Sequence, residues 1–375
     1  MQTVAPDTGP TCRFDTLGRM TSLGTAFHPK RNSLNALRLL FATAVIVAHS
    51  WPLSGRTDEP IGPGAFNSLG PWAVAGFFVI SGYLIASSRD HSELGRFLWR
   101  RILRIYPAFI VVLAVTAFVF APLSTLVMGE YSLGAGLEYL VKNAGLYIFT
   151  FDVTGTLAHA PYPATWNGSL WTLFYEALCY LAIGLAMTFV PRRWLARFLA
   201  VTLASGMAVT ASHVYLDVLN ISVLLHTVRL GTYFVAGALL YVLRERVAFR
   251  WEFAAASAAA VILTAVSGTF DFLAPIPLAY LCMWLGIALP LHRIGAKNDI
   301  SYGMYIYAFP VQQLLAITIG RGLPLWLYML ASIAATVPLA WASWTLVERP
   351  AMKLRGRTTQ RTRTMPRTLE KTGRG

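Results

Sequence analysis

Four ionisable side chains lie inside long apolar stretches of this 375-residue sequence: Arg38, His49, Glu176 and Arg229. An ionisable group at the centre of a membrane helix costs about 2.5–3.5 kcal/mol on insertion scales, so each needs a partner or a purpose. A histidine can take a proton from a hydroxyl group, and a carboxylate beside it raises its basicity and fixes its tautomer. An arginine binds phosphate with paired donors. These residue types indicate proton transfer near an anion-binding site.

Arg38 and His49 share one apolar segment and are eleven residues apart. In an α-helix this spacing leaves them on one face, offset by roughly 20°, and about 16 Å apart along the axis. Taken singly, Arg38 could reach out to the inner membrane surface, and His49 could lie at the outer headgroup level beside Trp51. Their common face favours the alternative, a polar stripe that lines a substrate passage or a buried site.

A basic run from Arg96 to Pro107 precedes the third apolar segment. Arg101 and Arg104 are spaced i, i+3 and therefore lie on one helix face. Two guanidinium groups so placed can bind a phosphate-bearing ligand from the cytoplasm. The alternative is that they are the ordinary positive charges of a cytoplasmic loop.

Glu176 lies more than two turns into the apolar segment that follows Asn167 and Gly168. A carboxylate at that depth must be paired or neutral. Pairing with His49 would give a general-base arrangement, and Arg38 is a second candidate partner. Arg229 could equally be its structural counter-ion, and the sequence leaves these alternatives open.

Composition defines the elements that must position these residues. Hydrophobic residues make up 56% and charged residues 13% of the chain, whereas a soluble globule carries about 25% charged residues. This excludes a disordered, collagen-like, coiled-coil or disulfide-scaffold protein. The net charge of +14 comes from short basic clusters between apolar stretches, which is typical of cytoplasmic loops rather than of nucleic-acid binding. There is no Cys/His metal spacing, so no metal is expected.

The hydropathy pattern predicts an all-α polytopic membrane helical bundle of about ten transmembrane helices with both termini cytoplasmic. Nearly all of the 31 Lys and Arg residues then lie inside, and only Arg56, Lys142 and Arg321 lie in outer loops. Segment 133–151 is interrupted by polar residues and is assigned to an external loop with a surface-lying helix. The predicted spans are 35–53, 71–88, 105–127, 168–190, 195–213, 220–242, 252–269, 273–291, 301–319 and 325–346.

The domain organisation follows from these spans. Residues 1–34 are expected to form a cytoplasmic N-terminal arm, and residues 35–350 form the transmembrane domain. The tail, 351–375, is rich in Arg and Thr, and we expect it to be disordered and held near anionic membrane lipid by charge. We expect a multi-pass protein of the inner (plasma) membrane.

Six blocks of sequence follow one another along the chain. They are Arg38 with His49, Gly76 to Ile85, Arg101 and Arg104 with Tyr106-Pro107, Asn167 to Glu176, Ile300 to Pro310, and Glu348 to Pro350. In this order they resemble the integral-membrane acyltransferase family 3, which includes polysaccharide O-acetylases and nodulation-factor acyltransferases. The sequence departs from the family pattern at Asn35, where an acidic residue is frequent, and at Ala308, where a histidine is frequent.

The resemblance implies that an acyl group, most simply acetyl, passes from cytoplasmic acyl-CoA to a hydroxyl of a cell-surface or exported glycan or glycolipid. It implies that His49 is the base, that Arg38 is essential, and that Glu176 orients His49 or the acceptor. Arg38, Arg101 and Arg104 would hold the anionic parts of CoA, the co-substrate. Direct transfer and an acyl-histidine intermediate both remain open. The alternative function is a transporter or flippase of a lipid-linked or acylated substrate, but no paired interrupted helices support it.

Overall fold

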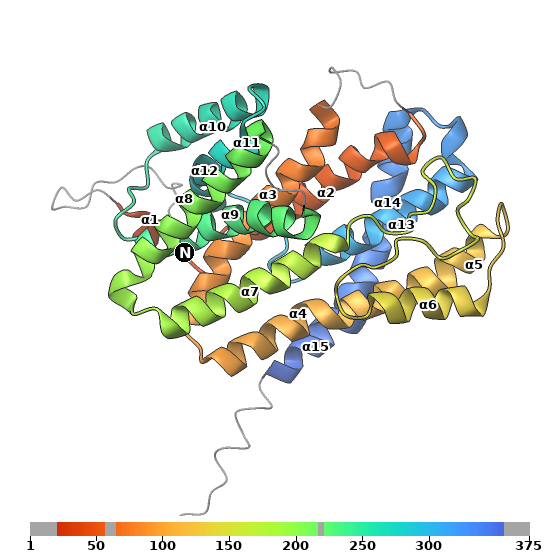
Figure 1. The fold of residues 1–375 in the computed structure, drawn as a ribbon, viewed down its shortest axis with the longest axis horizontal. Coiled ribbons are helices and arrows are strands. Elements are labelled where there is room, and N and C mark those ends of the chain that lie inside the picture. The colour runs from red at the N-terminus through yellow and green to blue at the C-terminus, as the bar shows by residue number, and fades with distance from the viewer. Residues whose placement is uncertain (1–20, 57–64, 217–220, 356–375) are drawn as a thin grey trace, which may run out of the picture.

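The computed structural model describes residues 21–56, 65–216 and 221–355, and within these ranges it is helical and has no strand (Figure 1). The long helices are α2 (Leu34–Leu53), α3 (Ala65–Asp90), α4 (Leu94–Val115), α7 (Trp171–Phe189), α8 (Arg192–Leu216), α9 (Ser222–Leu243), α10 (Trp251–Val266), α12 (Pro275–Ala288), α13 (Ser301–Thr318) and α14 (Leu325–Ser343). The shorter segments are α1 (Leu23–Ala26), η1 (Thr116–Phe120), α5 (Ala121–Ser124), α6 (Leu133–Asn143), α11 (Phe270–Leu273), η2 (Gly320–Gly322), η3 (Trp344–Glu348) and α15 (Arg349–Lys353).

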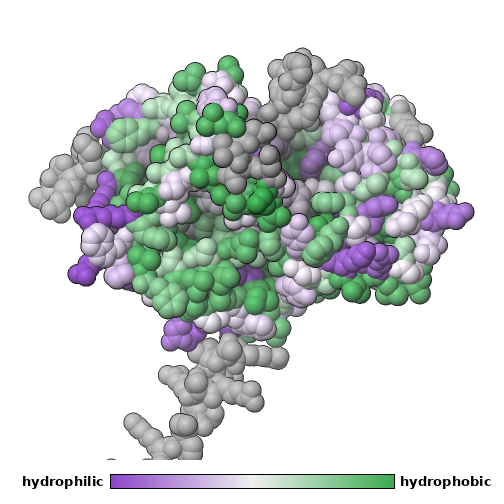
Figure 2. Space-filling model, in the orientation of Figure 1, coloured by the Kyte–Doolittle hydropathy of each residue, from purple (hydrophilic) through white to green (hydrophobic). Residues whose placement is uncertain are grey.

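The predicted all-α polytopic membrane bundle is confirmed. In the described ranges, 7 helical stretches are long and apolar enough to cross a membrane, and each matches a predicted span. Hydrophobic residues gather on the middle of the face in Figure 2, and hydrophilic residues lie toward its two sides. The seven stretches are Leu34–Leu53, Leu69–Asp90, Leu94–Ser124, Trp171–Phe189, Arg192–Leu216, Ser222–Leu243 and Leu325–Lys353.

The other three predicted spans, 252–269, 273–291 and 301–319, coincide with α10, α12 and α13. The first two are shorter apolar helices of 16 and 14 residues. Segment 133–151 is not among the candidate spans and contains only the 11-residue helix α6.

The expected terminal arms are described only in part. Residues 1–20 and 356–375 lie outside the described ranges, so the disorder expected of the tail is not addressed there. Within the described part, α14 continues through η3 into α15, which ends at Lys353. The first residues of the expected tail are therefore helical.

Helix α13 is the central element of the bundle. Its residues from Ser301 to Gln313 are all buried, and it packs against α2 and α14. The Gln312 side chain donates hydrogen bonds to the Ile46 carbonyl at 2.9 Å and to Ser50 Oγ at 3.0 Å, both on α2. A helix enclosed by protein can carry such polar residues because they find partners there, which explains why α13 is less apolar than a lipid-facing span.

Pro310 connects α13 to the start of α7. Proline has no backbone N–H, so the carbonyl four residues earlier, that of Ile306, loses its helical partner. Asn167 Nδ2 donates to this carbonyl at 2.8 Å, and Asn167 Oδ1 accepts from the Ser169 backbone N–H at 3.1 Å. The proline therefore creates the acceptor that fixes the Asn167 turn on the central helix.

Helices α3 and α9 cross with their backbones in close contact, at Gly82 and Gly237. A Cβ atom added to Gly82 would lie 2.0 Å from the Phe234 carbonyl oxygen, and one added to Gly237 would lie 2.0 Å from the Val79 carbonyl oxygen. Small residues allow membrane helices to approach so closely. This contact holds α3, which lines the site below.

We predict that Gly237→Ala destabilises the protein by about 1–3 kcal/mol, because the added methyl group must push the two backbones apart. The measurement is the thermal unfolding midpoint in detergent. Gly231→Ala is the matched control, since a Cβ there meets no heavy atom within 4 Å. Equal midpoints for the two variants would contradict the close crossing.

Candidate active site

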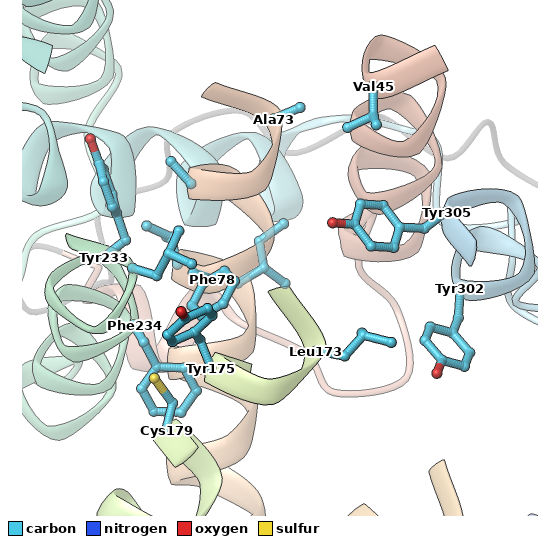
Figure 3. Packing of buried hydrophobic residues seen from close by; sticks show 14 of the residues in the cluster. Val45, Ala73, Phe78, Leu173, Tyr175, Cys179, Tyr233, Phe234, Tyr302 and Tyr305 are labelled. Atoms are coloured by element: carbon cyan, nitrogen blue, oxygen red, sulfur yellow. The ribbon is translucent and has the colours of Figure 1, made fainter. Parts of the chain in front are cut away.

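A cavity lies between α2, α3, α7 and α13. It offers about 40 Å³ to the centres of water molecules, which is room for two or three waters rather than for a whole acyl donor. Figure 3 shows Leu173 of α7 pointing toward Tyr302 and Tyr305 of α13. The residues that line the cavity are Arg38, Val74, Phe77, Phe78, Thr172, Leu173, Glu176, Ser301, Tyr302 and Tyr305.

Arg38 and Arg104 are held by the same carboxylate, Asp299, which comes just before α13. Asp299 Oδ2 accepts from Arg38 Nη1 at 3.2 Å and from Arg104 Nη2 at 2.7 Å. Its other oxygen accepts from Ser301 Oγ at 2.6 Å and from the Ser301 backbone N–H at 3.3 Å. Asp299 thus bonds the first residue of α13 and joins α2 to α4.

The second partner of Arg104 is Glu348, whose side chain has no exposed surface. Arg104 Nη1 donates to Glu348 Oε2 at 2.9 Å, and Ser343 Oγ donates to Glu348 Oε1 at 3.1 Å. Glu348 ends the π-helical turn η3, a kind of insertion that often marks functional sites. The guanidinium group of Arg104 also lies over the rings of Tyr302 and Trp344. Arg104 is therefore neutralised and fixed within the protein.

The charge of Asp299 depends on its two arginines. Burial alone would disfavour the carboxylate, but the guanidinium groups of Arg38 and Arg104 and the hydrogen bonds from Ser301 outweigh burial and lower the pKa of Asp299 to about 2. The two arginines, Asp299 and Glu348 form a cluster of paired side chains at the cytoplasmic end predicted for this bundle.

Arg101 differs from Arg104 although the two are one turn apart. In the described part of the chain, its Nε is buried and has no hydrogen-bond partner. It packs over the ring of Phe97 and is influenced electrostatically by Tyr180 and Glu176. Of the two predicted anion-binding arginines, Arg101 retains a free donor.

Glu176 lines the same cavity as Arg38. Its Oε1 accepts hydrogen bonds from Ser81 Oγ at 3.2 Å and from the Tyr180 hydroxyl. These are neutral partners, different from the three considered from sequence. Arg229 pairs instead with Asp271, with Nε and Oδ1 3.3 Å apart. The structure thus brings Glu176 near Arg38 and Arg101 and leaves Arg229 outside the site.

His49 lies further along α2, toward its C-terminal end. Its ring makes an edge-to-face contact with Phe309 of α13, with centroids 5.0 Å apart. The residue keeps part of its surface accessible, but its Nδ1 is buried and has no hydrogen-bond partner among the described residues. His49 thus packs against an aromatic ring and keeps one buried nitrogen without a partner among the described residues.

Further buried polar atoms without partners lie on the elements around His49. Within the described residues, they are Oε1 of Gln312, Oε1 of Gln313 and Oγ of Ser169. The glutamines follow Phe309 by about one turn, and Ser169 is adjacent to Gly168, against which Phe309 packs. Buried polar groups are normally satisfied, so this end of the bundle is suited to a ligand rich in hydroxyl groups.

Aromatic side chains lie beside both His49 and the cavity. His49 is not among the residues that line the cavity of Arg38 and Glu176. Phe77 lines that cavity, and its ring centroid lies 5.7 Å from those of both Tyr305 and Phe41. The cavity of Arg38 and Glu176 therefore does not extend to His49 in this conformation.

Sequence reasoning did not identify Asp299 and Glu348 as site residues. Both flank predicted spans and look like ordinary loop charges. The sequence Asp299-Ile-Ser301 could have indicated Asp299, since an aspartate just before a helix commonly bonds its first turn. The position of Glu348 next to the last apolar segment could have indicated Glu348. No group of three or more His, Cys, Asp and Glu residues in the described ranges could hold a metal ion.

The sequence profile of an acyltransferase domain matches residues 31–345. The chain belongs to the acyltransferase 3 family. It is a multi-pass membrane acyltransferase, with an acyl donor and an acceptor as substrates.

Two curated relatives span nearly the whole chain. An O-acetyl transferase of Shigella phage Sf6 is 31% identical over 337 residues, which cover 85% of this chain and 96% of the relative. Nodulation protein 10 of Rhizobium leguminosarum bv. viciae is 31% identical over 360 residues, which cover 87% of this chain and 94% of the relative. No solved structure matches the chain significantly.

We predict that Asp299→Asn destabilises the protein by about 3 kcal/mol, because it leaves two buried guanidinium groups with one carboxylate fewer. The control is Asp271→Asn, which breaks the more exposed pair with Arg229 and should cost less than about 1 kcal/mol. Chemical unfolding in detergent measures both. Similar losses for the two variants would show that Asp299 is not the central counter-ion.

The same carboxylate predicts a pH dependence. Its folded-state pKa of about 2 lies below the unfolded value of about 4, so its stabilising effect is complete above pH 4 and is lost as the pH falls toward 2. The unfolding midpoint of the natural protein should therefore fall across this range. Asp299→Asn should show a smaller fall.

Proposed function

We propose that this protein is an O-acyltransferase that moves an acyl group, most simply acetyl, from cytoplasmic acyl-CoA to a hydroxyl of a cell-surface or exported glycan or glycolipid. The observation that carries the proposal is the arrangement on α2. Arg38 is anchored by Asp299 beside the cavity, and His49 presents an unpaired buried Nδ1 three turns further along the same face. One helix thus joins an anion-binding end to a proton-accepting end.

The proposed reaction is general-base catalysis at His49. The imidazole takes the proton of the acceptor hydroxyl while its oxygen attacks the thioester carbonyl carbon. The C–O ester bond forms, the C–S bond breaks, and the CoA thiolate leaves with the proton returned from the imidazolium ion. The edge-to-face contact with Phe309 holds the imidazole ring in place for this proton transfer.

The remaining site residues position the donor. Arg101, whose buried Nε has no hydrogen-bond partner among the described residues, binds an anionic part of CoA. Arg38 lies where acyl-CoA passes from the cytoplasmic end of the bundle toward His49. Glu176 accepts bonds from Ser81 and Tyr180 and acts on the shape and charge of the cavity rather than on His49. The long pantetheine arm of CoA lets the phosphates stay at the arginines while the thioester reaches toward His49.

The proposed orientation places both termini and the basic helix ends in the cytoplasm of a cell with this protein in its plasma membrane. The support is the distribution of Lys and Arg, which concentrates on one side of alternating spans. The acyl donor then enters from the side where CoA is made. The acceptor reaches the aromatic pocket of His49 from the opposite side.

We predict that His49→Ala lowers acyl transfer by a factor of about 10²–10⁴, the usual contribution of a general base. The assay is the release of free CoA thiol from acetyl-CoA by membranes that contain the acceptor. His91→Ala is the control, because His91 is an exposed histidine that bonds only the Ser87 carbonyl. Unchanged transfer by His49→Ala would remove His49 from the mechanism.

The acceptor can be identified by mass spectrometry of surface glycans and secreted metabolites from cells with and without the gene. A difference of one acetyl group per unit would establish both the acyl group and the acceptor. A transporter or flippase would instead move its substrate unmodified and without releasing CoA thiol, which would contradict the proposal.

A further inference from the structure

Arg355 lies beyond the residues that match the family profile, which end at 345. The chain continues from α14 through η3 into α15, and α15 packs alongside α4 (Figure 1). This path returns the first part of the basic tail to the helix that carries Arg100, Arg101 and Arg104. Arg355 is only partly exposed there, so it is not a freely solvated tail residue.

Arg100, Arg101, Arg104 and Arg355 lie at the junction between α4 and the end of the described chain, and these arginines repel one another. Burial and the neighbouring guanidinium groups of Arg101, Arg104 and Arg100 lower the pKa of Arg355 to about 10. It remains a cation at neutral pH. Like charges held together in this way raise the free energy of the protein unless an anion joins them.

The donors at the junction are not all used. Nε of Arg101 and Nε of Arg355 are both buried without a hydrogen-bond partner in the described ranges. Arg104, by contrast, gives its two Nη groups to Asp299 and Glu348. At this junction, the buried guanidinium donors without a partner in the described chain are therefore those of Arg101 and Arg355, and Arg100 adds a positive charge nearby. The carboxylates of Asp299 and Glu348 are already paired with Arg38 and Arg104.

We propose that Arg355 joins Arg100 and Arg101 in a binding site for the phosphate groups of the acyl donor. The proposal rests on the proposed function, since it assigns the phosphates of CoA to these three side chains. Guanidinium groups recognise phosphate with paired donors. Two of these groups lie on α4 and the third follows α15, which packs against α4, at the end of the bundle where the cytoplasmic acyl donor enters. Arg104 takes a positioning role, because it holds α4, η3 and α13 together through carboxylates.

The test is the binding of CoA to the purified full-length chain in nanodiscs of zwitterionic phosphatidylcholine, followed by calorimetry. Arg355→Ala should weaken CoA binding by about 10- to 100-fold, the range expected for a lost charge-assisted contact. Inorganic pyrophosphate should compete with CoA in the natural protein and compete less well in this variant. Lys353→Ala is the matched control, because Lys353 lies on the same helix and is exposed.

Folding is checked separately. Without a ligand, Arg355→Ala should unfold at the same temperature as the natural protein or higher, because a repelling charge is removed. CoA should raise the midpoint of the natural protein more than that of the variant.

The outcomes are distinguishable. If the natural protein binds CoA and Arg355→Ala binds it equally well, the assignment of Arg355 is wrong and the proposed function stands. If the natural protein does not bind CoA, the donor itself is wrong and both proposals fall. If nanodiscs with phosphatidylglycerol show that the variant loses retained anionic lipid but not CoA affinity, the junction binds a lipid headgroup and the proposal is overturned.

Discussion

The bridge from Asp299 to Arg38 and Arg104 is the interaction on which the rest of the site depends. A single carboxylate at the start of α13 accepts from guanidinium groups on two other helices, and Glu348 completes the neutralisation of Arg104. Isolated charges would be too costly in this setting. Because Arg38 and Arg104 each have a carboxylate partner, the bundle can keep these two arginines largely enclosed by protein.

The central helix α13 organises both ends of the site. At its start, Asp299 and Ser301 hold the charged cluster. In its first two turns, Tyr302 and Tyr305 form part of the cavity wall. Toward its end, Phe309 contacts His49, and Gln312 fixes the same helix, α2, through its backbone. Tyr305 and Phe309, four residues apart on this helix, thus place aromatic rings beside the cavity and beside His49.

Much of this organisation could be predicted from the sequence. Apolar length and basic clusters indicated a membrane bundle, and helical spacing placed Arg38 and His49 on one face. Other features depend on tertiary contacts. Asp299 and Glu348 resemble loop charges until the fold brings them to Arg104, and the partners of Glu176 are neutral residues, Ser81 and Tyr180, with no charge pattern to reveal them. Arg355 belongs to a run of similar basic residues, and only the path of α15 distinguishes it.

The hydrogen bond from Asn167 to the carbonyl freed by Pro310 has a consequence for the evolution of these proteins. Any residue other than proline at position 310 would restore the N–H that the helix lacks, and the Asn167 amide would then have to share its acceptor with that N–H. Loss of Asn167 would conversely leave the buried Ile306 carbonyl without this hydrogen bond. The two positions, 143 residues apart in the chain, should therefore covary among homologues, with proline and asparagine gained or lost as a pair.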